Sequence, residues 1–309
     1  MLVIAAPGQG AQTPGFLSPW LEFPFVAEQI GAWSDLADCD LIRYGTAGDE
    51  DEIKDTAVAQ PLLVAAALAA AQVLGVADCV SSGIVAGHSV GELGAGGIGG
   101  VISADDAMRL TGVRGRAMAK AAAAESTSMT AVLGGDEAEV LAVIAKHGLT
   151  PANINGAGQI VAAGTTAQLA AFAGDPPPRA RLRPLQVAGA FHTAHMAPAS
   201  EELREAAQAV QVHDPVLTVL SDADGAAVRT GTEWLTRIVN QVSAPVRWDL
   251  CMAGMRERGA TAFIELPPAG TLTGLARRSL PGVALLALKT PADLDAAKEL
   301  VAEHARSDS

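Results

Sequence analysis

The stretch at residues 84–92 constrains the fold of this chain more than any other. A short apolar run leads into Gly87-His88-Ser89-Val90-Gly91, and an alanine- and glycine-rich stretch follows. This order predicts a buried strand, a sharp turn and a helix, because glycines let strand and helix approach closely. The turn would expose the Ser89 hydroxyl and leave the Val90 N–H free to stabilise an oxyanion. On its own, the motif also fits a Gly/Ser turn without chemistry.

Length and composition fit one large α/β domain with a smaller insert, or two domains. The chain has 309 residues, half of them apolar, and its formal net charge of −13 argues against a general nucleic-acid binder. The three cysteines, Cys39, Cys79 and Cys251, are far apart and show no zinc-like spacing. Reduced thiols in a cytoplasmic protein are therefore expected.

No membrane association is predicted. The N-terminus has no positively charged region before its apolar run, so a signal peptide is not expected. The most apolar stretch, residues 61–77, is interrupted by Gln72 and Gly75 and predicts a buried helix.

A glycine-rich turn follows the first apolar run, residues 2–6. Its sequence is Pro7-Gly8-Gln9-Gly10-Ala11-Gln12, which lacks the GxGxxG pattern and a following Lys-Ser/Thr pair. A nucleotide site is therefore discounted. The exposed backbone N–H groups of this turn would suit the second half of an oxyanion hole.

Residues 126–188 predict a separate subdomain. Their pattern indicates strand, helix, two strands, helix and strand, with the last strand at 182–187. This is the order of a ferredoxin-like fold. The expected architecture is a large α/β-hydrolase-like domain with a parallel central sheet, residues 1–125 and 189–309, plus this small α+β subdomain. The active site is expected in the cleft between them.

An exposed serine needs a general base, and two histidines lie on a loop between the expected domains. His192 follows the bulky Phe191 and leads the loop, so it is favoured over His195. His88 adjoins Ser89, but neighbours in a tight turn usually point apart. An α/β-hydrolase would place its histidine near the C-terminus after an acidic residue, and this chain does not fit that order.

The chain resembles the malonyl-CoA:acyl carrier protein transacylases over nearly its whole length. The motifs that carry this resemblance are Pro7-Gly8-Gln9-Gly10-Ala11-Gln12, Gly87-His88-Ser89-Val90-Gly91-Glu92, Val113-Arg114-Gly115, Asn153-Ile154-Asn155, Gly189-Ala190-Phe191-His192, Asn240-Gln241-Val242-Ser243-Ala244-Pro245-Val246-Arg247-Trp248 and Leu272-Thr273-Gly274-Leu275. Ala244 departs from the family, which often carries Asn before Pro-Val-x-Trp.

The resemblance implies a role for each matching residue. Ser89 would be the nucleophile and His192 its base, oriented by the backbone carbonyl of Gln241. The backbone N–H groups of Gln9 and Val90 would form the oxyanion hole. The residues implied to contact the substrate are Arg114, Phe191, Gln9, His88 and Asn155.

Arg114 would hold the free carboxylate of the malonyl group, which suits the bidentate guanidinium. Phe191 resembles the malonyl-selective form of the motif, where a smaller residue would admit an α-methyl branch. The expected reaction is two-step malonyl transfer from malonyl-CoA to the phosphopantetheine thiol of an acyl carrier protein, in fatty-acid or polyketide synthesis. No cofactor or metal is implied.

The carrier is expected to be acidic, so it would need a basic patch on this acidic enzyme. The densest basic clusters are Arg179, Arg181 and Arg183, and Arg277 with Arg278. Two other classes stay open. A serine hydrolase would release malonate without a carrier, and a docking protein would need no nucleophile.

Overall fold

The computed structural model describes residues 1–80 and 82–305. The strands are β1 (Leu2–Ala6), β2 (Ile84–Gly87), β3 (Thr127–Gly134), β4 (Thr150–Gly156), β5 (Gln159–Thr165), β6 (Ala180–Pro184), β7 (Thr218–Val219), β8 (Ala262–Glu265) and β9 (Ala284–Ala287). The α-helices are α1 (Pro24–Ala37), α2 (Leu41–Ala47), α3 (Thr56–Leu74), α4 (Val76–Cys79), α5 (Gly91–Ile98), α6 (Ala104–Ala123), α7 (Glu137–Lys146), α8 (Thr166–Gly174), α9 (Ala197–Ala207), α10 (Gly231–Gln241), α11 (Trp248–Glu257), α12 (Thr271–Ser279) and α13 (Leu294–His304). Short 3₁₀ helices are η1 (Ser18–Glu22), η2 (Glu52–Lys54), η3 (Ala194–Met196) and η4 (Pro291–Asp293).

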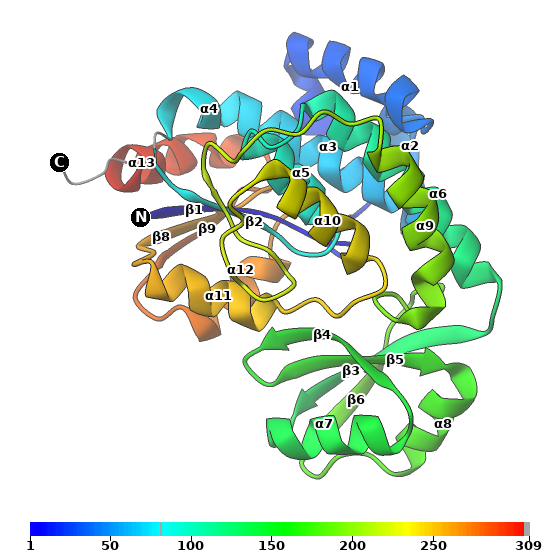
Figure 1. The fold of residues 1–309 in the computed structure, drawn as a ribbon. Coiled ribbons are helices and arrows are strands. Elements are labelled where there is room, and N and C mark those ends of the chain that lie inside the picture. Colours follow the sequence, from blue (N-terminus) through cyan, green and yellow to red (C-terminus); the bar gives the residue numbers. More distant parts are fainter. Residues whose placement is uncertain (81, 306–309) are drawn as a thin grey trace.

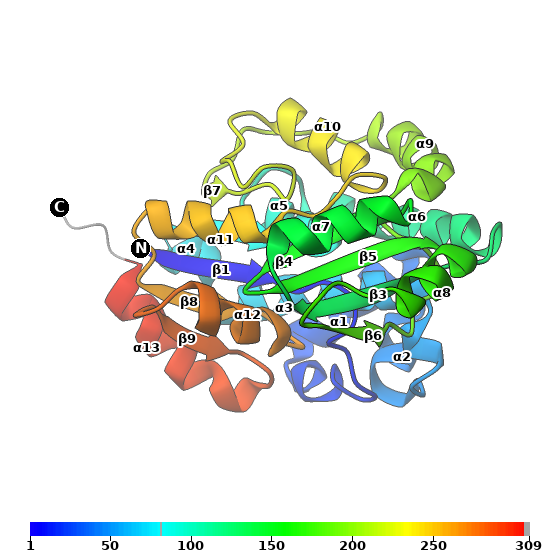
Figure 2. The same ribbon diagram turned by 90° about the horizontal axis from the view of Figure 1, so that it is seen from below.

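A parallel sheet forms the centre of the larger part, in the order β7-β2-β1-β8-β9. The central strand β1 is buried on both faces. Leu2, Ile4 and Ala6 join the core that includes α3, while Val3 and Ala5 face α11 and α12. Figure 2 shows α11 and α12 on the near side of β1 and β8. Continuous apolar strands are typical of a parallel sheet covered by helices on both faces, so the predicted α/β class is confirmed.

The long apolar helix α3 belongs to the core of the larger part. Asp55 caps its start by accepting a hydrogen bond from the Ala57 N–H, and Gly75 ends it with a φ of 70°. By length and composition it could cross a membrane, yet 78% of its most apolar window is buried inside the molecule. It packs against α6, α5 and α1, as expected of a buried helix.

The smaller sheet is antiparallel, in the order β4-β5-β3-β6. Along the chain its elements follow the predicted order of strand, helix, two strands, helix and strand. Figure 1 shows α7 and α8 on the face of this sheet turned away from the larger part.

The last strand of this sheet begins and ends earlier than predicted. β6 covers Ala180–Pro184, although the apolar pattern predicted 182–187. Leu185 donates one more backbone bond to Met129, and the Gln186 side chain then accepts a hydrogen bond from Lys54. The chain leaves the sheet here, so Leu185 and Val187 line a cavity instead of extending the ladder.

The glycine-rich helix α5 packs closely on its neighbours. A Cβ at Gly96 would lie 2.2 Å from the Trp234 ring, and one at Gly99, directly after the helix, would lie 2.4 Å from Val219. Glycine costs about 1 kcal/mol in a helix interior, and the close approach of these neighbours explains its use here.

Candidate active site

The predicted strand, turn and helix around Ser89 are confirmed. β2 ends at Gly87, α5 begins at Gly91, and Ser89 between them has a φ of 54°. A Cβ at Gly87 would lie 2.0 Å from the Gly91 carbonyl carbon, and one at Gly91 would lie 2.3 Å from the Ala6 oxygen. Both glycines are therefore required for the turn that presents the serine hydroxyl.

Ser89 and His192 are 103 residues apart in sequence and hydrogen-bonded in the structure. The Ser89 hydroxyl lies 2.8 Å from His192 Nε2. His192 Nδ1 lies 2.8 Å from the backbone oxygen of Gln241 and donates to it. Because Nδ1 carries the proton, Nε2 is free to accept the serine proton. The arrangement has the geometry of a nucleophile, a base and a group that orients the base.

His192 stays uncharged in the folded protein. Burial lowers its pKa to about 3, and the positive charge of Arg114 acts in the same direction. A neutral imidazole is the form that can accept a proton, so burial prepares His192 for the role of a base.

His195, the alternative base, is directed elsewhere. Its Nδ1 lies 2.8 Å from a carboxylate oxygen of Glu125, at the molecular surface. The preference for His192 is therefore consistent with the positions of both rings.

Arg114 lies directly behind the nucleophile. It is 1% exposed, and its Nη2 donates to Ser89 Oγ at 3.2 Å and to the Gln241 side-chain oxygen at 2.8 Å. Its Nη1 donates to the Gln60 side-chain oxygen at 2.7 Å. Burial lowers the Arg114 pKa to about 10, so the guanidinium remains charged at neutral pH. Among the described residues, all its side-chain hydrogen-bond acceptors are uncharged.

A cavity of about 200 Å³ opens in front of Ser89. Its walls come from both sheets. Ser89, Val90 and Gln9 lie on the side of the parallel sheet, and Ala131 and Val161 lie on the antiparallel sheet. The remaining lining residues are Gly8, Gln60, His88, Met118, Met129, Asn153, Asn155, Gln159, Leu185, Val187, Phe191, His192, Thr271, Leu272 and Leu275. Arg114 reaches this space through Ser89 and does not line the wall.

Three further predicted residues lie around this cavity. His88 Nε2 donates to the side-chain oxygen of Asn155 at 2.9 Å, so these two residues join the Ser89 turn to β4. Burial lowers the His88 pKa, which favours its neutral form. Phe191 is 7% exposed and forms part of the apolar wall.

The backbone N–H groups of Gln9 and Val90 have no hydrogen-bond acceptor within residues 1–80 and 82–305. Both residues border the cavity. The Gln9 side chain is turned away and donates to the Lys54 carbonyl. Two free N–H groups beside a nucleophile can stabilise a developing oxyanion.

The small sheet is tied to the larger part beside the cavity. Ile154 donates to the Val246 oxygen at 2.9 Å, and Val246 donates back to the Ala152 oxygen at 2.9 Å. This exchange positions the Asn153-Ile154-Asn155 motif next to Asn240-Gln241 and the segment after it.

Sequence reasoning missed four polar groups near Ser89: the side chains of Gln60, Glu92, Asp222 and Gln241. Glu92 belongs to the serine motif, but the motif alone indicates no role for its side chain. Gln60 marks the edge of an apolar run, and a polar residue there was a signal of a buried partner. Asp222 lies three residues beyond β7, which is paired with β2, but no local pattern indicates this pairing.

The described residues contain no group of three or more His, Cys, Asp or Glu side chains that could hold a metal ion. Acyl transfer through a serine ester needs only the nucleophile, the base and the oxyanion donors.

Comparison with known proteins identifies the family. The acyl transferase domain family matches residues 27–290. The malonyl CoA-acyl carrier protein transacylase of Mycobacterium tuberculosis strain H37Rv is 55% identical over 298 residues, 96% of this chain and 98% of that protein.

Solved structures agree. The crystal structure of MCAT from Mycobacterium tuberculosis has a TM-score of 0.93 and 54% identity, covering 96% of this chain and 99% of that one. A malonyl-transacylase in complex with a type II PKS acyl-carrier protein has a TM-score of 0.88 and 28% identity, covering 96% and 99%. The chain therefore belongs to the malonyl-CoA:acyl carrier protein transacylase family of acyl transferases.

Proposed function

We propose that this enzyme moves a malonyl group from malonyl-CoA to the phosphopantetheine thiol of an acyl carrier protein, through a malonyl ester on Ser89. The observation that carries the proposal is the hydrogen-bonded chain from Ser89 through His192 to the Gln241 carbonyl, with the charged Arg114 beside it. The family and the carrier-bound relative support the same reaction.

In the first half-reaction Ser89 Oγ attacks the thioester carbonyl carbon and its proton passes to His192 Nε2. The carbon–sulfur bond then breaks, and the CoA sulfur leaves with the proton from His192. In the second half, His192 takes the proton of the carrier thiol, whose sulfur attacks the ester carbon. The serine oxygen recovers its proton as the ester bond breaks, so each half-reaction leaves His192 neutral.

The N–H groups of Gln9 and Val90 are assigned to the oxyanion of each tetrahedral intermediate. A preorganised donor of this kind contributes about 3–4 kcal/mol to lowering the barrier. Neither N–H group has an acceptor among the described residues, so the oxyanion can form without breaking a hydrogen bond within that part of the chain.

Arg114 is assigned to the malonyl carboxylate. Its present acceptors are two amide oxygens and the serine hydroxyl, and a carboxylate would be a stronger acceptor than any of these. Phe191 is assigned to selecting an unbranched malonyl group, and His88 and Asn155 to shaping the wall of the pocket.

We assign residues 1–125 and 189–309 to the catalytic domain and residues 126–188 to a ferredoxin-like subdomain. The acyl group would bind in the cleft between them, because the walls of the cavity come from both sheets. Free Cys39, Cys79 and Cys251 support a cytoplasmic location.

The test of this function is a complete turnover with malonyl-CoA and phosphopantetheinylated carrier, followed by mass spectrometry of the carrier. Malonyl-carrier is the expected product. Free malonate formed at the same rate without carrier would identify a hydrolase instead.

A further inference from the structure

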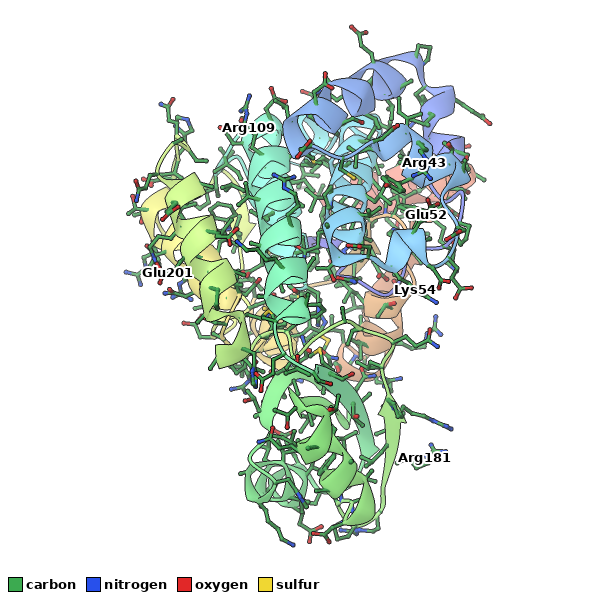
Figure 3. All side chains as sticks on the ribbon, turned by 90° about the vertical axis from the view of Figure 1, so that its right-hand side faces the viewer. Arg43, Glu52, Lys54, Arg109, Arg181 and Glu201 are labelled. Atoms are coloured by element: carbon green, nitrogen blue, oxygen red, sulfur yellow. The ribbon has the colours of Figure 1, made fainter. Side chains whose placement is uncertain are left out.

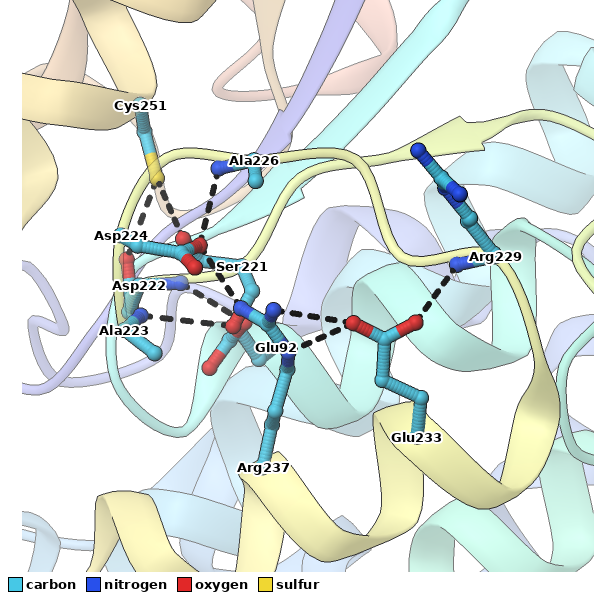
Figure 4. A network of polar contacts seen from close by, with 10 residues as sticks. All are labelled: Glu92, Ser221, Asp222, Ala223, Asp224, Ala226, Arg229, Glu233, Arg237 and Cys251. Carbon is cyan, nitrogen blue, oxygen red and sulfur yellow. Dashed lines mark hydrogen bonds and ion pairs between the residues drawn. The ribbon is translucent and has the colours of Figure 1, made fainter.

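Two buried carboxyl groups lie below the Ser89 turn, and the transfer steps above do not use them. Glu92 on α5 is 1% exposed, and Asp222, three residues beyond β7, is fully buried. Figure 4 shows them together with Ser221 and Cys251, beneath the loop that follows β7. Carboxyl groups are rarely buried without a specific partner, so their contacts need an explanation.

Asp222 holds the backbone of the nucleophile. Its Oδ2 accepts a hydrogen bond from the Ser89 N–H at 2.7 Å. Ser89 needs this support because its φ of 54° is unfavourable for a residue with a Cβ. The Asp222 backbone N–H in turn donates to Glu92 Oε1 at 2.9 Å, which fixes the Glu92 carboxyl group to the main chain of Asp222.

The side chain of Gln241 connects this pair to the rest of the site. Its Nε2 donates to the backbone oxygen of Ser89 at 3.0 Å, to Asp222 Oδ2 at 3.2 Å and to Glu92 Oε2. Its Oε1 accepts from Arg114 at 2.8 Å. These partners fix the amide orientation, since a flipped amide would point its oxygen at three acceptors.

Gln241 also holds the base, because its backbone oxygen accepts from His192 Nδ1. Gln241 therefore contacts the carboxyl pair through its side chain and His192 through its backbone oxygen. A change in the pair would be transmitted to Ser89 through the Asp222 bond and to His192 through Gln241.

Both carboxyl groups of the pair reach the same nitrogen, Gln241 Nε2. Three acceptor oxygens surround Nε2, which carries only two hydrogens. Glu92 Oε2 and Asp222 Oδ2 are two of these oxygens, so the pair brings two potential negative charges to one donor group. Two ionised carboxylates that contact one nitrogen away from water would repel each other strongly, and one shared proton would remove that repulsion.

The titration of the pair agrees with a shared proton. Burial raises the pKa of Glu92 to about 7, and burial together with the Glu92 charge raises the Asp222 pKa well above its usual value. The other ionisable groups facing the pair are Arg114 from α6, which lowers both pKa values, and Cys251 from α11, whose own pKa is raised.

We propose that Glu92 and Asp222 are positioning residues that share one proton and lock Ser89 and the Gln241 carbonyl in the geometry needed for acyl transfer. This inference rests on the proposed function, because it assigns the pair to the same serine and base.

The experiment compares Glu92→Gln, Glu92→Leu and Glu92→Asp. Glutamine has the size and the zero charge of a protonated Glu92, leucine removes every polar contact, and aspartate keeps the carboxyl group but withdraws it from Gln241 and the Asp222 N–H. Glu233→Gln is the matched control, because Glu233 lies on the same helix as Gln241 and pairs at the surface with Arg237 (Figure 4).

Two readouts separate positioning from stability. The first is the rate constant for labelling Ser89 with an alkyl fluorophosphonate, with the labelled amplitude giving the competent fraction. The second is kcat and KM for malonyl-CoA. We expect Glu92→Leu and Glu92→Asp to lower the labelling rate constant and kcat at least tenfold, with KM changed less than threefold. Glu92→Gln should recover most of that loss, and Glu233→Gln should match the wild type.

Three results would overturn the proposal. Unchanged rate constants with only a lower amplitude or melting temperature would make the pair merely structural. Equal losses in Glu92→Gln and Glu92→Asp would exclude the shared proton. Equal losses in Glu233→Gln would show that the effect is not specific. If Glu92→Leu fails to fold, the labelling rate constants of Glu92→Asp and Glu92→Gln still test the proposal.

Failure of the proposed function is distinguishable from failure of this inference. Fluorophosphonate labelling does not depend on the malonyl group or on the carrier. A wild type that labels normally but takes no malonyl group would contradict the proposed substrate, while the comparison of Glu92 variants would still test the pair.

Discussion

His192 Nδ1 donates to the backbone oxygen of Gln241 at 2.8 Å, so a main-chain group orients the base where a carboxylate does so in the Ser-His-Asp triad. A neutral carbonyl stabilises an imidazolium less than a carboxylate would. Burial, and after it the charge of Arg114, outweigh the stabilisation from this hydrogen bond, and the His192 pKa falls to about 3. The resting base is therefore uncharged well below neutral pH.

This low pKa predicts that the reactivity of Ser89 changes little as pH falls below neutral. A base works when deprotonated, so its rate is lost only as pH falls through the folded pKa. The fluorophosphonate labelling rate of Ser89 should change by less than about threefold between pH 7 and 5.5, whereas an ordinary histidine of pKa near 6.5 would lose roughly eightfold. A loss of that size would show that His192 titrates normally.

The lowered His192 pKa should also make the free energy of unfolding depend on pH. Its contribution should be lost as pH falls, whereas a salt-bridged histidine loses its contribution as pH rises. The unfolded chain takes up a proton near pH 6.5 and folded His192 does not, so its contribution to stability is complete above 6.5 and declines as pH falls toward 3. This contribution should disappear from urea unfolding curves of His192→Gln measured across that range. An unaltered pH dependence in that variant would count against a neutral buried His192.

Replacing Arg114 should change which acyl group the enzyme accepts. Arg114→Ala removes the only positive group that contacts Ser89 Oγ among the described residues, and malonyl loading from malonyl-CoA should fall roughly 10- to 100-fold, the value of a hydrogen bond to a charged group. Acetyl loading from acetyl-CoA should persist or rise. The control is Arg116→Ala, since Arg116 lies on the same helix but binds the Ala37 carbonyl at the surface. Equal losses for both acyl groups would argue against a carboxylate clamp.

Opening the apolar wall at Phe191 should relax selectivity. Phe191→Ala should raise loading with methylmalonyl-CoA relative to malonyl-CoA by about tenfold or more, because one methyl group in a pocket is worth about 1–3 kcal/mol. The loading ratio comes from intact-protein mass after short incubation with each thioester. An unchanged ratio would mean that Phe191 only packs the wall.

The carrier is expected to dock on the exposed edge strand β6. Arg181 and Arg183 pair with Leu133 and Ala131, and paired residues share a face, so Arg183 lies on the same face as the cavity-lining Ala131. Figure 3 shows Arg181 pointing away from the sheet. Arg179 is less available because it forms an ion pair with Glu139.

Reversing both charges, Arg181→Glu with Arg183→Glu, should raise KM for the carrier about three- to tenfold at low salt, with less effect at high salt because exposed charges are screened. KM for malonyl-CoA should not change. Arg277→Glu with Arg278→Glu is the comparison, because these residues lie at the far end of α12 from its cavity-lining start. A carrier KM that responds only to the second pair would move the docking surface to α12.

The sequence predicted the parts of the site that depend on local geometry. The turn at Ser89 follows from the glycines on either side of it, since neither position can accept a Cβ. The order of elements in residues 126–188 follows from periodicity, and it was correct except for the limits of β6. His192 was favoured from its place on the loop between the expected domains, and the role of the Gln241 carbonyl came from resemblance to a family.

What could not be predicted depends on tertiary pairing. Asp222 reaches the Ser89 N–H because β7 pairs with β2, and two residues of strand carry little sequence signal. In the sequence, Gln60 is only the polar boundary of an apolar helix. Its contact with Arg114 forms because α6 packs against α3. The role of the Gln241 side chain depends on its contacts with Arg114, Glu92 and Asp222, which only the folded structure brings together.

The central claim is that Ser89 carries the malonyl group, and intact-protein mass after mixing with malonyl-CoA tests it most directly. The wild type should gain one malonyl group, which is then lost on addition of phosphopantetheinylated carrier, and Ser89→Ala should gain nothing. A malonyl adduct on Ser89→Ala, or a wild type that transfers malonyl to the carrier without ever forming an adduct, would contradict the account.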